Sequence, residues 1–69
     1  MSEQIAKVIE VSSASDKGFV DAIEKGLRKC ATTIKNIQGA WVNEMKVVTT
    51  PDGEVIDWRV NLKVTFIVD

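Results

Sequence analysis

The chain has 69 residues, of which 28% are charged, a formal net charge of −1, one cysteine and no histidine. A chain of this length forms one domain, 1–69, with a modest hydrophobic core. Because one cysteine and no histidine can build neither an internal disulfide nor a zinc site, we expect oligomerisation to stabilise the fold. The near-neutral net charge gives no basic surface for binding nucleic acid. No apolar run reaches the roughly 20 residues of a membrane span. The polar start Met1–Gln4 and the lone thiol indicate a cytoplasmic protein.

The first predicted element is a strand over Ile5–Val11. Its alternation is imperfect, because Val8 and Ile9 are both apolar. Such a pattern is typical of a strand that packs on one face and is partly covered on the other by a neighbouring subunit. The run Ser12–Ser15 consists of small residues, mostly serine, and predicts a loop.

The segment Asp16–Asn36 is the one predicted helix. Gly18 is the expected N-cap with Asp21 reaching back to it, and Ser15 is the rival cap. Gly26 in the helix interior costs about 1 kcal/mol relative to alanine, so we expect it to allow a close approach to the sheet. The apolar stripe repeats at spacings of three and four residues and comprises Phe19, Ile23, Leu27, Cys30 and Ile34.

Two further strands, Ala40–Thr49 and Glu54–Val68, are predicted on either side of a turn at Thr50–Gly53. The last strand spans on the order of 50 Å at about 3.3 Å per residue, which exceeds what the core of so small a domain needs. We therefore expect part of it to serve a partner. Its apolar face comprises Ile56, Trp58, Val60, Leu62, Val64, Phe66 and Val68.

The order strand, helix, strand, strand predicts an α+β fold, in which a three-stranded antiparallel sheet packs one face on the helix. The other face then lies against water or neighbouring subunits. We expect it to carry Arg59, Asn61 and Lys63 from the last strand and, if they lie opposite Val42, also Trp41, Asn43 and Met45.

Nothing in the sequence indicates an enzyme. An imidazole base is lacking, the carboxylates show no catalytic spacing, and Gly39 and Gly53 stand alone rather than in a phosphate loop. Cys30 lies on the apolar stripe and is expected to be a buried small hydrophobe. A cation site lined by oxygen atoms across a symmetry axis stays open, so the metal ligands are unknown at this point.

Trp41 and Arg59 are the candidate binding residues on the open face. An exposed tryptophan there is either an anchor of a subunit interface or a platform for a flat ligand. Arg59 is able to stack on Trp41 or to pair with an anion. The alternatives for Arg59 are a salt bridge between subunits or a place on a solvated face. Trp58 has the phase of Val60 and is expected at the core or its rim.

The whole chain resembles the dodecin family. The resemblance runs through Lys7–Glu10, Asp21–Ile23, Lys35–Ile37 and Arg59–Phe66, and it covers nearly all of 6–69. It implies a β-α-β-β fold with the sheet partly wrapped round the helix, and a hollow homododecamer. It also implies a protein that binds flavins such as FMN or riboflavin and stores or sequesters them without catalysis.

The resemblance places the two best-known flavin contacts at Gly39 and Arg59, and neither residue keeps the family's side chain. Dodecins that bind flavin stack its ring on a tryptophan just after the helix-end Asn-Ile segment, where Gly39 stands here, and Trp41 follows two residues later. A flavin-contacting glutamine is matched by Arg59. Either Trp41 replaces the platform and the shell stores a flavin, or Trp41 fills the pocket and the assembly is structural or ion-binding.

Overall fold

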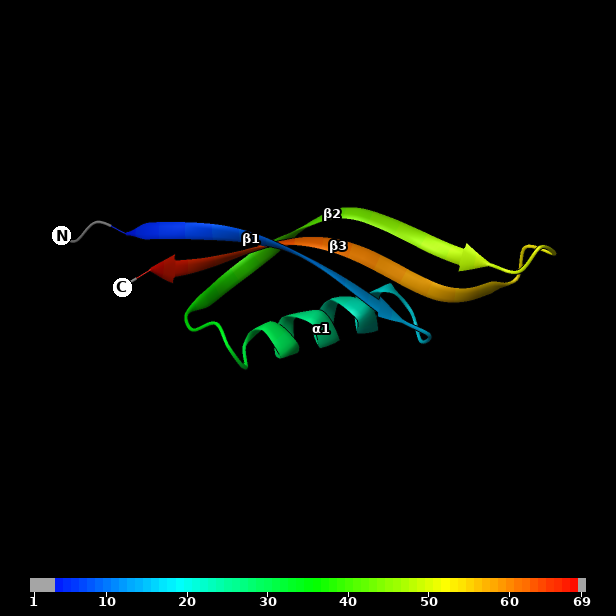
Figure 1. Ribbon diagram of the computed structural model, residues 1–69, viewed down its shortest axis with the longest axis horizontal. Helices are drawn as coiled ribbons and strands as arrows, with labels where there is room; N and C mark the ends of the chain where they lie inside the picture. The colour runs from blue at the N-terminus through cyan, green and yellow to red at the C-terminus, as the bar shows by residue number, and fades with distance from the viewer. Residues whose placement is uncertain (1–3, 69) are drawn as a thin grey trace.

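The computed structural model describes residues 4–68, so the start Met1–Glu3 lies outside the described residues. Along the chain follow β1 (Ile5–Ser15), α1 (Phe19–Cys30), β2 (Ile37–Thr49) and β3 (Val55–Val68). The sheet order is β1-β3-β2, and both outer strands run antiparallel to β3 (Figure 1). Helix α1 packs against β1 and β3 on one face of this sheet. The predicted α+β fold is therefore confirmed.

Strand β1 is longer than the sequence indicates, and the loop predicted at Ser12–Ser15 is wrong. These residues continue the antiparallel ladder with β3, from Ser12 opposite Asn61 to Ser15 opposite Trp58. The backbone of β3 supplies hydrogen-bond partners all along this segment, which outweighs the weak strand preference of serine. Tertiary pairing thus decides the end of β1.

Helix α1 is shorter than predicted, since it ends at Cys30 and not at Asn36. The Thr32 and Thr33 backbone amides donate to carbonyls three residues earlier, at 3.2 Å and 3.1 Å. The Thr32 hydroxyl also donates to the Lys29 carbonyl at 2.6 Å. These bonds replace the helical ladder. Asn36, with a φ of 64°, reverses the chain, and β2 begins at Ile37 rather than at Ala40.

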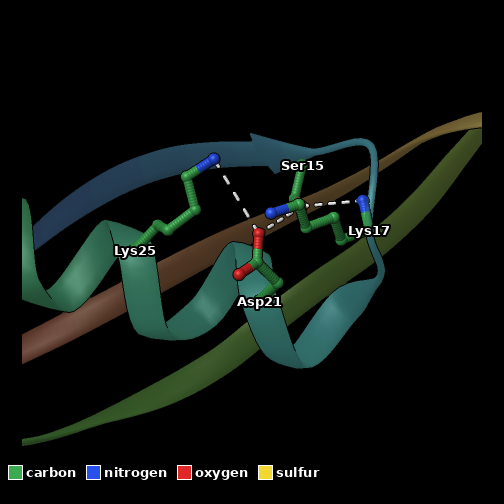
Figure 2. A network of polar contacts seen from close by, with 4 residues as sticks. All are labelled: Ser15, Lys17, Asp21 and Lys25. Atoms are coloured by element: carbon green, nitrogen blue, oxygen red, sulfur yellow. Dashed lines mark hydrogen bonds and ion pairs between the residues drawn. The ribbon is translucent and has the colours of Figure 1, made fainter.

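The start of α1 is held by a side chain from β1 (Figure 2). Gly18 is the N-cap, as predicted, with a φ of 141° that suits glycine. Asp21 does not reach back to it. Instead the Ser15 hydroxyl donates to the Asp21 carboxylate at 2.5 Å and accepts the Lys17 backbone N–H at 2.9 Å. The Lys25 ammonium completes the network, 3.8 Å from the same carboxylate.

The core lies between α1 and the middle of β3, and its fully buried apolar residues are Ala22, Val60, Leu62 and Val64. Gly26 allows this close approach, because a Cβ there would lie 2.9 Å from the Ser13 Cβ. Cys30 packs against the same cluster but is half-buried, so it is less buried than predicted.

The β2-β3 hairpin extends beyond α1 at one end of the molecule (Figure 1). Its turn is closed by the Thr50 N–H, which donates to the Glu54 carbonyl at 2.8 Å, and Gly53 takes a φ of 85°. The molecule is 56 Å long, so β3 has the predicted excess length. Ile56 in the extension is 51% exposed, although it has the phase of the core residues.

Candidate functional site

The register of the strands separates two faces of the sheet. The inner face carries α1, and we call the opposite one the outer face. On the outer face Lys63 lies directly opposite Trp41 of β2 on one side and opposite Glu10 of β1 on the other. The Trp41 side chain is 63% exposed. Trp58 lies on the inner face and is half-buried, which fits its expected place at the rim of the core.

Strand β2 contains a bulge that changes the phase of its second half. The register shifts between Val42 and Glu44, so Asn43 is an extra residue without a partner of its own on β3. Met45 therefore lies opposite Val60 on the inner face, and its expected place beside Trp41 on the outer face is wrong. A bulge of one residue exchanges the two faces of everything that follows.

The three candidate binding residues, Gly39, Trp41 and Arg59, lie at two separate places on the outer face. Gly39 lies opposite Thr65 on the outer face, two residues before Trp41, and a Cβ at Gly39 would have no neighbour within 4 Å. Arg59 shares this face but lies four residues along β3 from Lys63, about 13 Å away. Its Nε donates to the Asp57 carboxylate at 2.9 Å. The chain thus brings Gly39 and Trp41 together, and Arg59 does not stack on Trp41.

A ladder of polar side chains crosses all three strands between these two places. The Asn43 amide donates to the Asn61 side-chain oxygen at 3.1 Å, and the Asn61 amide donates to the Ser12 hydroxyl at 3.4 Å. Next to it an open pocket is lined by Ser12, Ser13, Ala14, Glu44, Lys46, Arg59, Val60 and Asn61. Sequence reasoning missed Ser12 and Lys46, because their places depend on the longer β1 and on the bulge.

One carboxylate has a distinctly shifted acidity. The hydrogen bond from Ser15 is the main cause that lowers the pKa of Asp21, and the nearby Lys25 ammonium acts in the same direction.

Within residues 4–68, no cluster of three or more cysteine, aspartate or glutamate side chains is arranged to hold a metal ion. No helix in the same range is long and apolar enough to cross a membrane.

The architecture defines a class of small α+β proteins in which a long, curved antiparallel sheet of three strands holds a single helix and leaves its outer face open. The sequence profile of the dodecin family matches residues 5–69, and the chain belongs to that family. Members of this family are in general non-enzymatic proteins that bind small molecules and form homo-oligomers.

Solved dodecin structures agree with this assignment. The chain is 28% identical to a dodecin from Streptomyces davaonensis, with a TM-score of 0.90 and coverage of 99% of this chain and 98% of that one. A dodecin from Streptomyces coelicolor is 26% identical, with a TM-score of 0.89 and coverage of 100% and 97%. A dodecin from Mycobacterium tuberculosis, described as calcium-chelating, shares the fold at 22% identity and a TM-score of 0.79, and the match covers 94% of this chain and 91% of that one. No curated protein matches the chain.

Proposed function

We propose that this chain forms a hollow homododecamer that binds and stores or sequesters a flavin of the FMN or riboflavin type, or a similar flat aromatic ligand, without catalysis. The observation that carries the proposal is the exposed indole of Trp41 on the outer face, directly opposite Lys63. A lone free thiol, Cys30, favours a reducing compartment, so we propose the cytoplasm as its location.

The surroundings of Trp41 suit a flat ring. An aromatic ligand that stacks on an indole gains an offset π contact in addition to buried apolar area. Gly39 offers open space beside Trp41, so a ring has room to approach the backbone there. Lys63 supplies a cation next to the stacking position. The ligand site and the subunit interface are compatible, because a ring on Trp41 presents its second face to a neighbouring copy.

The need for assembly follows from what the single chain leaves uncovered. Helix α1 packs on β1 and β3, and within residues 4–68 several apolar side chains of the inner face beyond it stay more than a third exposed. They are Val42, Met45, Val47 and Ile56. Burying them in neighbouring copies adds apolar area that the small core lacks. A dodecamer of the 7.6-kDa chain has a mass of about 91 kDa, whereas a species of one chain's mass by light scattering would refute the assembly.

The ligand proposal is tested by titrating the purified assembly with FMN and with riboflavin. We expect quenching of flavin fluorescence by the wild type and none by Trp41→Ala, with the same mass for both assemblies. Trp58→Phe is the matched control, since Trp58 lies on the inner face and the variant should quench like the wild type. Unchanged flavin fluorescence at micromolar wild-type protein would contradict the proposal.

The second candidate is a structural or ion-binding assembly that has lost flavin binding. It is favoured by Arg59, which is held by Asp57 rather than near Trp41, and by Gly39 at the position where flavin-binding dodecins have a tryptophan. The calcium-chelating dodecin with this fold makes calcium the ion to test. A colourless protein that ignores both flavins but gains thermal stability with calcium would select this candidate.

A further inference from the structure

A groove of about 460 Å³ lies open between β1 and the C-terminal half of α1, and we call it the β1-α1 groove. Its apolar lining comprises Ile9, Val11, Cys30 and Ile34. Ile9, Val11 and Cys30 also pack against the core cluster. Ile34 follows the helix end, where its backbone N–H donates to the Cys30 carbonyl at 2.9 Å. The groove is therefore an apolar surface that continues the core outward.

The groove has a positively charged rim. Among the described residues that line it, Lys25 and Lys29 are charged and none is a carboxylate. Asp21 lies 3.8 Å from the Lys25 ammonium and compensates that charge. Lys29 forms no ion pair with any residue in 4–68, so a positive charge remains beside the apolar lining. A partner that fits this groove combines apolar side chains with a negative charge.

The far end of the β2-β3 hairpin carries that combination, and we call residues 45–56 the hairpin extension. Its inner face exposes Met45 by 54% and Ile56 by 51%. Its turn carries Asp52, and Glu54 follows directly, without a basic residue between Val47 and Ile56. Neither carboxylate forms an ion pair within residues 4–68. One chain thus presents two unpartnered surfaces of matching apolar character and opposite charge.

We propose that the hairpin extension of one copy packs by its inner face into the β1-α1 groove of a second copy, with Asp52 and Glu54 near Lys29. This inference rests on the homo-oligomer of the proposed function and specifies where its copies meet. The hairpin extends past the start of α1 whereas the groove follows the end of α1, so a chain does not fill its own groove (Figure 1). Because two different surfaces meet, the contact is head-to-tail and repeats from copy to copy until it closes as a ring.

The contact is tested by the mass of the full-length protein in light scattering over a dilution series. Met45→Asp on the hairpin extension and Ile34→Asp in the groove each bury a charge in the contact, so each should raise the concentration at which the assembly dissociates about tenfold or more. A mixture of the two variants keeps one intact head-to-tail contact. It should therefore form pairs of unlike copies, detected by co-purification with a tagged copy, that neither variant forms alone.

The matched control is Val20→Asp, which adds the same charge at a side chain of α1 that is 67% exposed and lies outside the groove. It should keep the wild-type mass. Lys29→Glu and Glu54→Lys change exposed side chains and so leave the fold of the single chain intact. Each should weaken the assembly, and both together in one chain should restore it at least in part, because the two charges are exchanged.

The outcomes separate this contact from the assembly as such. A wild-type protein of one chain's mass would refute the homo-oligomer itself. An assembly that survives both Met45→Asp and Ile34→Asp, or that Val20→Asp weakens equally, would overturn this contact alone. So would a double charge variant no more stable than either single one. Wild-type assembly that binds anilinonaphthalene sulfonate and loses it in Ile34→Asp would also overturn the contact, since the groove is then open to a small ligand.

Discussion

The hydroxyl of Ser15 donates to the carboxylate of Asp21 at 2.5 Å, and this bond joins the last residue of β1 to the first turn of α1 (Figure 2). Ser15 is only 4% exposed, and it also accepts the Lys17 backbone N–H. The connection between strand and helix is therefore fixed by one small polar side chain. A carboxylate in the first turn also suits the positive end of the helix dipole.

Removing this hydroxyl should destabilise the protein. Ser15→Ala leaves the Lys17 N–H and the Asp21 carboxylate without their shared partner, so we expect the thermal midpoint to fall by about 4–8 °C. Ser12→Ala is the control, since Ser12 is exposed and its bond is longer, at 3.4 Å. Calorimetry of both variants measures the difference, and equal midpoints for Ser15→Ala and wild type would contradict the structural role.

The same contact predicts a dependence on pH. The pKa of Asp21 is lowered in the folded chain, chiefly by the Ser15 hydrogen bond, so its carboxylate binds a proton less readily there than in the unfolded chain. Its contribution is therefore fully present above the ordinary aspartate pKa of about 4 and is lost as the pH falls through the lowered folded value. Urea unfolding should show the largest gap between wild type and Asp21→Asn near neutral pH. A gap that widens in acid would contradict this sign.

Gly26→Ala should destabilise the protein although alanine favours a helix by about 1 kcal/mol. The new Cβ would lie 2.9 Å from the Ser13 Cβ and 3.1 Å from its Oγ, so α1 and β1 have to move apart. Overpacking of this kind costs about 1–3 kcal/mol and outweighs the helix preference. Denaturant unfolding measures the sum. Ser13→Gly in the Gly26→Ala background should recover part of the loss, and a stabilised single variant would refute the close contact.

Leu62→Ala should lower the free energy of unfolding by about 2–5 kcal/mol, because Leu62 is fully buried between α1 and the sheet. Val68→Ala on the same strand is the comparison, since Val68 is 39% exposed and its truncation should cost much less. Denaturant titrations of both variants at one protein concentration measure the difference. Equal losses would mean that the end of β3 is buried as deeply as its middle.

Gly39→Trp tests whether the outer face tolerates the tryptophan that the family resemblance implies at this position. A Cβ at Gly39 meets nothing within 4 Å, so the variant should fold and keep its thermal midpoint within a few degrees. In the Trp41→Ala background it should restore flavin quenching. Restored quenching by Gly39→Phe and none by Gly39→Leu would attribute the effect to the aromatic ring. No quenching by any of them would remove the outer face near Gly39 as a stacking site.

The alternation in the last strand, the apolar stripe of the helix and the turn at Thr50–Gly53 are local patterns, and the sequence alone determined them. Each depends on residues within a few positions of one another, and each fixed an element of the α+β fold. The close approach at Gly26 was also foreseeable, because a glycine inside a helix needs a compensating reason.

The tertiary structure decided what depends on pairing between distant segments. Ser12–Ser15 is a strand only because β3 offers it a backbone ladder, and α1 ends at Cys30 where the threonines turn the chain. The Asn43 bulge moves Met45 to the inner face and brings Lys46 opposite Arg59. A bulge leaves no trace in the alternation of a single strand, because the extra residue is defined only against its partner. The sequence by itself therefore determined the elements and their order, and the register between strands decided which side chains meet on the outer face.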